Sequence, residues 1–223
     1  MKTMGIVCVS VVLCALAVGS SSAQMFGRAS GWSGLWHPTV GAGAFYEVEK
    51  PGQPKQPFDF AVVGKETAQG HDAVWIELTF STERMGNMLV KELVSFDPAK
   101  MEIQNYKVVV QMPGRPPMLM PDEMMTSHQP FKFNDAKATS VDLGSQSVTT
   151  PAGTFSCEHY RQKDGSSEFW VSEKVAPIGL VKSVDKDGQT TTLVKVVTDA
   201  KDQITGTPQP FNPMMFMSPQ SQQ

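Results

Sequence analysis

Cys157 and His159 are the pair in this chain whose residue types could supply a nucleophile and its base. They are two positions apart in TFSCEHYR, a segment of strand character, so both side chains should point to the same face. A Cys–His dyad also needs a third group that orients the histidine. No Asn or Asp is visibly placed for that role, and the second ligand pair of a zinc site is missing. The sequence therefore favours a buried Cys157 that packs as a small apolar residue.

Methionine suggests a second chemistry. Segment 111–129 contains four prolines and five methionines, and thioether sulfur is a ligand that Cu(I) prefers in proteins. The residues that could bind Cu(I) are Met118, Met120, Met124, Met125 and His128. Methionine is also a flexible apolar residue that adapts to irregular ligands and gaps. We favour the apolar interpretation and keep a copper-handling protein as an alternative.

The remaining polar residues contain no recognisable catalytic set. Asp122 and Glu123 are adjacent, so on a strand or a helix they would not face each other as a general acid and base. The chain has no glycine-rich phosphate loop, no G-x-S-x-G motif and no H-E-x-x-H motif. We therefore expect a protein without catalytic residues and without a cofactor.

Residues 1–23 have the form of a secretory signal peptide. Lys2 supplies the positive start, 5–18 is apolar, and small residues precede the expected cleavage after Ala23. Neither cysteine of this segment directly follows a small residue, which argues against lipidation. The apolar run is too short to span a bilayer as a mature helix, and no second long run follows. We expect a periplasmic or secreted mature chain without a transmembrane segment.

Removal of the signal leaves Cys157 as the single cysteine, so no disulfide can form within the mature chain. A mature chain of about 200 residues must then rely on one hydrophobic core. The formal net charge is −3, with 19 Lys and Arg against 22 Asp and Glu and no basic run. This composition argues against nucleic acid as a partner.

Strand-length runs separated by turn signals begin at Val40 and predict an antiparallel, mainly β fold. About ten strands are expected, at 40–49, 57–65, 73–80, 86–96, 101–112, 138–148, 153–161, 168–172, 178–184 and 189–198. Trp32, Leu35 and Trp36 share one face of a short predicted N-terminal helix. Segment 111–129 is expected to form a Pro/Met-rich loop. The predicted domain covers 24–205, and a disordered tail is expected at 206–223.

The expected architecture is a single curved antiparallel sheet, or half-barrel, whose concave apolar face would hold a hydrophobic ligand such as a lipid or an acyl chain. Candidate lining residues are Phe60, Trp75, Leu89, Met118, Met120, Phe155 and Trp170. The sequence does not say which face points inward, so each of them is also consistent with ordinary core. A third hypothesis is a cell-envelope interaction module, whose open sheet edge pairs with a strand of a protein partner.

Two segments of the chain resemble a known family. WHPTVGAGAFYEVE at 36–49, and TPAGTFSCEHYR with FWVSEKVAPIGLVKS at 150–183, look like exported bacterial proteins of the lipoprotein-carrier (LolA/LolB-like) half-barrel fold. The resemblance is strongest over 138–198 and weaker over 37–110. It implies a half-barrel with a cavity under a helical lid, in which the best-known members carry the acyl chains of lipoproteins across the periplasm. Because this fold binds its ligands by shape and burial, the resemblance implies no catalytic residue in this chain.

Overall fold

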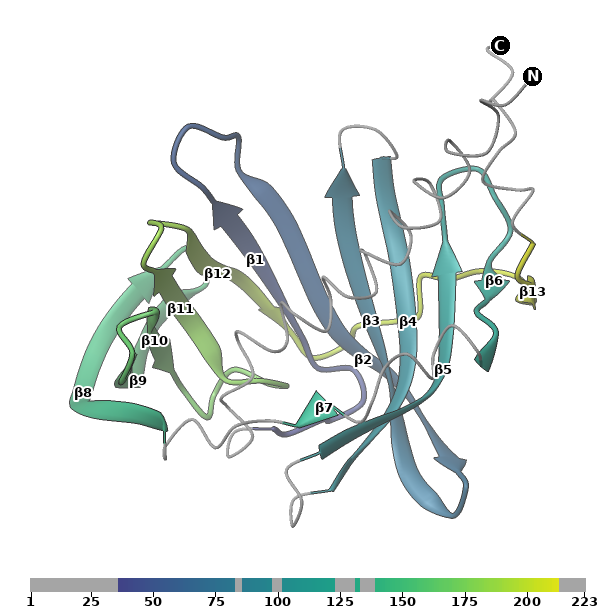
Figure 1. Ribbon diagram of the computed structural model, residues 1–223, viewed down its shortest axis with the longest axis horizontal. Helices are drawn as coiled ribbons and strands as arrows, with labels where there is room; N and C mark the ends of the chain where they lie inside the picture. The colour runs from purple at the N-terminus through teal and green to yellow at the C-terminus, as the bar shows by residue number, and fades with distance from the viewer. Residues whose placement is uncertain (1–35, 83–85, 98–101, 123–130, 133–138, 213–223) are drawn as a thin grey trace, which may run out of the picture.

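The computed structural model describes residues 36–82, 86–97, 102–122, 131–132 and 139–212. Within these ranges the chain forms thirteen strands and no helix, and all thirteen strands belong to one sheet (Figure 1). The mainly β prediction is therefore confirmed. The predicted N-terminal helix and the signal peptide fall almost wholly on residues before 36, outside the described part of the chain.

Ten of the described strands have five or more residues, and they overlap the ten predicted runs. They are β1 (Gly43–Glu49), β2 (Gln56–Ala68), β3 (His71–Thr82), β4 (Gly86–Asp97), β5 (Glu102–Gln111), β8 (Ser140–Thr150), β9 (Gly153–Gln162), β10 (Ser167–Val171), β11 (Leu180–Asp185) and β12 (Thr190–Val197). Three further strands have two residues each: β6 (Met118–Leu119), β7 (Phe131–Lys132) and β13 (Gln209–Pro210).

The sheet consists of two antiparallel meanders. β1–β5 pair in sequence order in one, and β8–β12 pair in sequence order in the other. β1 and β12 join the two meanders, because they pair antiparallel from Gly43 opposite Val197 to Glu49 opposite Thr190. The sequence predicts the pairing of neighbours, but this long-range pair has no local signal. It leaves β8 at one end of the sheet order and β13 at the other.

The hairpin between β2 and β3 shows how local sequence builds the first meander. Gln69 and Gly70 form its two-residue loop, and both have positive φ, 50° and 82°. Two positive φ values are the signature of a type I′ turn, whose twist matches that of the flanking strands. Glycine adopts this geometry without a steric cost, so Gly70 fixes the register that places Glu66 opposite Ala73.

The Pro/Met-rich segment 111–129 takes part in the sheet, which corrects its prediction as a loop throughout. Met118–Leu119 form β6 and pair antiparallel with Val110 and Val109 of β5. Pro117 directly precedes this strand, and a proline has no N–H to give to a ladder. β6 is therefore confined to two residues.

The sheet also reaches into the predicted tail. Gln209–Pro210 form β13, which pairs parallel with β6, and the N–H of Phe211 donates to the carbonyl of Leu119 at 3.1 Å. The prediction of disorder now concerns 213–223, which lie outside the described residues. The domain boundaries themselves stay a prediction.

The main core draws residues from both meanders. Tyr46 of β1 is buried, and its hydroxyl donates to the carbonyl oxygen of Leu180 of β11 at 3.1 Å. Trp36 packs edge-on against Phe60 of β2, with ring centroids 6.3 Å apart. These contacts hold the start of the described chain and the second meander against β1 and β2.

Candidate functional site

One face of the β1–β5 meander is apolar, and we call it the apolar face. In β3, Val74, Ile76 and Leu78 point to this face and alternate with Trp75 and Glu77, which point away. Directly opposed residues share a face, so the register extends the pattern across five strands. Members exposed by 4% or less are Ala44, Tyr46, Phe60, Val62, Ile76, Leu78, Met88, Val90 and Val94. The same core cluster contains residues of the second meander, such as Phe169, Val171 and Leu180, so the second meander packs against part of this face.

Glu92 interrupts the apolar face with a carboxyl group. In the register of β4 it lies opposite Ile76 of β3 and Val108 of β5. Its neighbours on the same face of β4 are Val90 and Val94. Four apolar residues thus frame one glutamate, which is only partly buried.

Asn105 reaches the same face because β5 contains a bulge. The pairing shifts from Leu93 opposite Lys107 to Val94 opposite Asn105, so Tyr106 is an extra residue on β5. With an unbroken ladder Tyr106 would lie opposite Val94, and Asn105 would point to the other side of the sheet. The bulge instead turns Asn105 toward Glu92, and its Nδ2 donates to Glu92 Oε2 at 3.0 Å.

The hydrogen bond between Asn105 and Glu92 does not satisfy all the polar atoms of the pair. Burial raises the pKa of Glu92 from 4.5 to about 7, because its apolar surroundings penalise the charged form. Asn105 gives one N–H to Glu92, and its buried Oδ1 has no hydrogen-bond partner among the described residues. Among the described residues, Asn105 is the hydrogen-bond partner of the Glu92 carboxyl. An acceptor atom left unpaired in an apolar setting costs free energy unless a donor reaches it.

The opposite face of the same meander carries a segment of chain, and we call it the strap face. The strap is residues 198–208, which link β12 to β13 across β1–β5 (Figure 1). At its start the N–H of Ala200 donates to the carbonyl of Gly41 at 2.9 Å. At its end the N–H of Gln209 donates to the carbonyl of Pro117 at 2.9 Å. The strap therefore ties the two ends of the first meander together.

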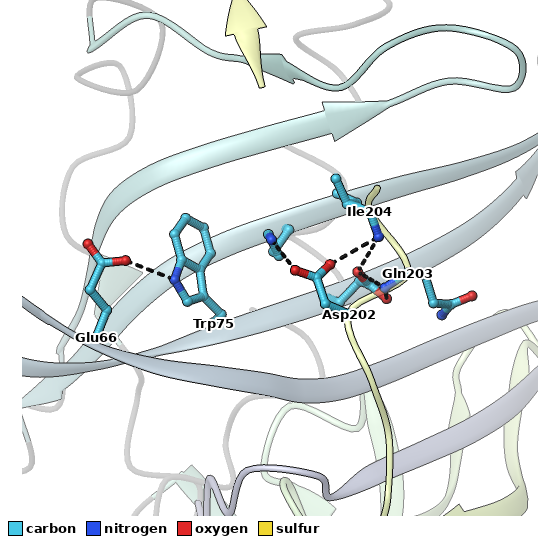
Figure 2. A network of polar contacts seen from close by, with 7 residues as sticks. Glu66, Trp75, Asp202, Gln203 and Ile204 are labelled. Carbon is cyan, nitrogen blue, oxygen red and sulfur yellow. Dashed lines mark hydrogen bonds and ion pairs between the residues drawn. The ribbon is translucent and has the colours of Figure 1, made fainter. Parts of the chain in front are cut away.

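Glu77 is the buried carboxyl of the strap face, with 2% of the residue exposed. Its oxygens accept the N–H of Gln203 at 3.0 and 3.2 Å and the N–H of Ile204 at 3.3 Å. Burial raises the pKa of Glu77, the two backbone N–H groups lower it, and the neighbouring Asp202 carboxyl raises it. Figure 2 shows Asp202, Gln203 and Ile204 lying together over the sheet.

Charged groups surround Glu77 and complete this arrangement. Lys91 of β4, which lies opposite Glu77 in the register, forms an ion pair with Asp202. The Asp202 side chain also accepts the N–H of Ile204 at 3.0 Å. Both carboxylate oxygens of Asp202 thus meet a donor, and Ile204 is 7% exposed. We interpret this cluster as a fastening for the strap.

The predicted ligand-binding residues do not share one surface. Phe60 lies opposite Leu78 and so belongs to the apolar face, and Met118 lies opposite Val110 at the far edge of that face. Trp75 and Leu89 point to the strap face. Trp75 donates its Nε1–H to Glu66 at 3.0 Å (Figure 2), and the Nζ of Lys91 lies 5.0 Å from its ring.

Two further predicted residues, Phe155 and Trp170, lie in the second meander. Both are partly buried against the main core. Trp170 stacks on His159, with ring centroids 4.3 Å apart, and its Nε1–H donates to Gln146 at 2.8 Å. The N–H of Met120 donates to the carbonyl of Val108 at 2.9 Å, and Met120 is partly buried. These residues stay a prediction as ligand contacts.

Cys157 is buried, which confirms the prediction of an apolar packing role. Burial raises the pKa of its thiol to about 11, and the Sγ–H points to the carbonyl of Phe155 at 3.6 Å. His159 Nε2 instead lies 3.1 Å from Glu168 Oε2. A thiol with a raised pKa is a poor nucleophile, because the thiolate is the reactive form.

The copper alternative concerns residues that are only partly described. Met118 is fully buried, whereas Met124, Met125 and His128 lie outside the described residues, so this set stays a prediction. The described residues contain no group of three or more His, Cys, Asp and Glu that could hold a metal ion. In the same part of the chain, no helix has the length and apolar character needed to cross a membrane.

Glu92 and Asn105 were not singled out by the sequence, although a weak signal exists for one of them. Met88, Val90, Glu92 and Val94 occupy alternate positions of one strand, so a glutamate falls on an apolar stripe. Leu89 and Leu93 on the other stripe hide this signal, because both stripes then look apolar. Nothing in the sequence of β5 announces the bulge that turns Asn105.

Comparison with known proteins adds likenesses to solved structures alone. No protein-family model and no curated protein matches the sequence. MucB in complex with MucA(peri) is 12% identical, with a TM-score of 0.40, over 81% of this chain and 59% of that one. A Parabacteroides distasonis protein described as a lipoprotein is 14% identical, with a TM-score of 0.35, over 73% of this chain and 97% of that one. A Bacteroides fragilis exported protein with a YmcC-like fold is 13% identical, with a TM-score of 0.35, over 72% of this chain and 97% of that one. With TM-scores under 0.5, these likenesses carry no inference about function.

Proposed function

We propose that this chain is an exported, non-catalytic binding protein that holds a hydrophobic ligand, a lipid or an acyl chain, on the apolar face of β1–β5. One observation carries the proposal: a face built of buried and partly buried apolar residues contains a carboxyl on β4 that accepts a hydrogen bond from a carboxamide on β5. A face meant only as core would gain stability from apolar residues at both positions. Polar groups placed among apolar lining residues are typical of sites that orient a ligand.

The location and the shape form part of the same proposal. The predicted signal peptide at 1–23 supports the export of the mature chain. A curved sheet, or half-barrel, would turn the apolar face into a concave surface. The sequence resemblance to lipoprotein carriers implies the same shape. From the predicted set, Phe60 and Met118 are the residues that this proposal retains as lining.

A role in binding also agrees with the chemistry of the polar pair. Ile76, Val90, Val94 and Val108, which frame Glu92, carry no titratable group. General acid–base chemistry at one glutamate would need a reacting group in hydrogen-bond reach and a second group of matched pKa. Burial of an apolar chain, oriented by one polar contact, needs neither.

The test is mass spectrometry of organic extracts from the mature protein, purified from its native envelope without detergent. The proposal predicts a lipid or an acylated species at a stoichiometry near one per chain. A second exported protein, carried through the same purification, controls for lipid carried over nonspecifically. Protein that is empty in repeated preparations and binds no single-chain amphiphile in solution would contradict the proposal.

A second candidate function, an interaction module of the cell envelope, is favoured by the edge strand β8. β8 is a terminal strand of the sheet order, and it exposes Val141 by 46% and Leu143 by 38%. Exposed apolar residues on an edge strand favour pairing with a strand of another protein. If this is the function, replacing Val141 and Leu143 with Lys should abolish a specific partner complex while the extracted ligand is unchanged. An unchanged complex would exclude this edge.

A further inference from the structure

The acceptors on the apolar face define what kind of head group could meet them. Glu92 offers its carboxyl oxygens, and Asn105 offers the buried Oδ1, for which the described part of the chain supplies no donor. Because the Asn105 Nδ2–H donates to Glu92, the amide orientation is fixed, and Oδ1 is turned away from the carboxylate. The ionised Glu92 carboxylate and Asn105 Oδ1 both accept hydrogen bonds, so a head group that meets these two atoms has to donate to them, while Asn105 Nδ2 keeps a second N–H as a donor.

The charges around Glu92 further restrict the class of head group that could bind there. The residues that frame Glu92 in the register, Ile76, Val90, Val94 and Val108, bring no cation to it. On the strap face, by contrast, Lys91 stands beside Glu77 and Asp202. A carboxylate in an apolar setting is stabilised by a cation that also donates hydrogen bonds. A primary ammonium group meets both requirements, since it has three N–H donors and a positive charge.

We infer that Glu92 and Asn105 bind the primary ammonium group of an amphipathic ligand whose apolar chain lies along the apolar face of β1–β5. The inference rests on the proposed function and adds the head-group class to it. The ammonium group donates to a carboxylate oxygen of Glu92 and to Asn105 Oδ1. The apolar chain contacts the partly buried side chains of the same face, with Val108, opposite Glu92, nearest in the register.

This assignment also explains why the bulge of β5 is placed where it is. Without the extra residue Tyr106, Asn105 would leave the apolar face and Glu92 would have no amide partner. Bulges often re-aim a side chain next to a functional site. Here the bulge turns one acceptor inward and sends Tyr106 outward, where its hydroxyl lies 2.9 Å from Ser95 Oγ.

Four probes of equal chain length test the inference by calorimetry at pH 7.4: dodecylammonium, dodecyltrimethylammonium, dodecanol and dodecanoate. The three ionic probes are kept below their micelle concentrations, and dodecanol is kept below its solubility limit. Dodecylammonium should bind at least about tenfold more tightly than the others, since it combines charge with N–H donors. Dodecyltrimethylammonium has the charge without the donors, so it separates the two contributions.

Variants locate the effect on the protein. Glu92→Gln should weaken dodecylammonium binding by about tenfold or more and leave dodecanol binding within about twofold. Asn105→Leu should weaken dodecylammonium binding in the same direction. The matched control is Glu47→Gln, which removes one carboxylate from an exposed position and corrects for the net negative charge of the chain.

The outcomes separate this inference from the proposed function. Equal affinity for dodecylammonium, dodecanol and dodecanoate would overturn the head-group assignment and leave hydrophobic binding standing. A loss of dodecylammonium affinity of the same size in Glu47→Gln and Glu92→Gln would also overturn it, since the attraction would then be nonspecific. If none of the four probes binds, both the inference and the proposed function are wrong.

Discussion

The two faces of the β1–β5 meander each carry a glutamate, buried Glu77 and partly buried Glu92, and the hydrogen-bond partners of the two differ. Glu77 on the strap face accepts the N–H of Gln203 and of Ile204, and an ion pair between Lys91 and Asp202 lies beside it. Glu92 on the apolar face has one side-chain amide as its partner, in a frame of Val and Ile. Burial raises the pKa of both groups above the ordinary 4.5.

The difference teaches how to separate a structural carboxyl from a binding carboxyl. A carboxyl whose oxygens already accept hydrogen bonds from the protein contributes to stability and needs no ligand. A carboxyl that sits among apolar residues beside an unpaired amide oxygen reduces stability, so its retention needs another reason. The predictions below follow from this comparison, from the largest expected effect to the smallest.

Removing the Glu77 carboxyl should have the largest effect. In Glu77→Leu the N–H groups of Gln203 and Ile204 lose their acceptor in a buried position, which costs about 1–3 kcal/mol for each group. We expect a loss of about 4 kcal/mol in the free energy of unfolding, measured by urea denaturation. Hydrogen exchange of the 203 and 204 amides should accelerate before that of the β3 amides. A strap that stays as protected as in the unchanged protein would show that Glu77 does not fasten it.

The pH dependence of stability is the next largest effect. The folded-state pKa of Glu92 is about 7 against an ordinary 4.5, so between these values the folded protein holds a proton that the unfolded chain has lost. The contribution of the protonated Glu92 to the free energy of unfolding is full below pH 4.5 and is lost as the pH rises through 7. At about 1.4 kcal/mol per pKa unit, Glu92 alone should lower stability by about 3 kcal/mol between pH 4.5 and pH 8.

Asp59 and Glu77 should also lower the free energy of unfolding as the pH rises, because burial raises the pKa of both, that of Asp59 to about 6. The variant Glu92→Gln should therefore remove part of the pH dependence and leave the rest. Urea midpoints at pH 5 and pH 8 check this, with Glu47→Gln as the exposed control. A pH dependence that is identical in Glu92→Gln and in the unchanged protein would mean that Glu92 is ionised in the folded state throughout.

Lys91 tests the electrostatics of the strap face at a smaller scale. Lys91→Met keeps the aliphatic stem beside Trp75 and removes the ammonium that pairs with Asp202. Two carboxyls, Glu77 and Asp202, then lie together without their cation, so we expect a loss of about 1 kcal/mol at pH 8 and less at pH 5. Equal losses at both pH values would point to lost packing rather than lost charge.

The smallest change in stability should follow from the most radical change on the apolar face. In the double variant Glu92→Leu with Asn105→Leu, both partners of the polar pair become apolar, which is close to neutral or stabilising. We expect a free energy of unfolding at pH 7 within about 1 kcal/mol of the original or above it, together with the loss of dodecylammonium binding. A loss of several kcal/mol would show that the pair is structural, as Glu77 is.

The sequence predicted the strands well because their signals are local. Alternation in AVWIELTF and the loops at Lys163–Ser166 and Asp185–Gly188 are each complete within about ten residues. The β1–β12 pair has no such signal, because Gly43 and Val197 are distant in the chain. β6 and β13 were not predicted for a related reason. Each is a two-residue strand beside a proline, and each is defined by its pairing with another strand and not by a pattern in its own sequence.

The candidate site was harder to predict than the fold. Large apolar residues such as Phe60 and Trp75 stand out in the sequence, but the register puts them on opposite faces. A glutamate between leucine and lysine looks like an ordinary surface residue, and Glu92 has that context. Its burial depends on which stripe of β4 faces inward, and Asn105 depends on one bulge. Both are tertiary facts that no short window of sequence contains.

The most direct test of the contrast between Glu77 and Glu92 is a carbon-13 NMR titration of both side-chain carboxyls, with and without dodecylammonium. The account predicts that the pKa of Glu92 falls by about 1–3 when the cation binds, because an opposite charge favours the ionised form, while the pKa of Glu77 does not change. A pKa of Glu92 that is the same in both titrations, or parallel changes at Glu92 and Glu77, would contradict it.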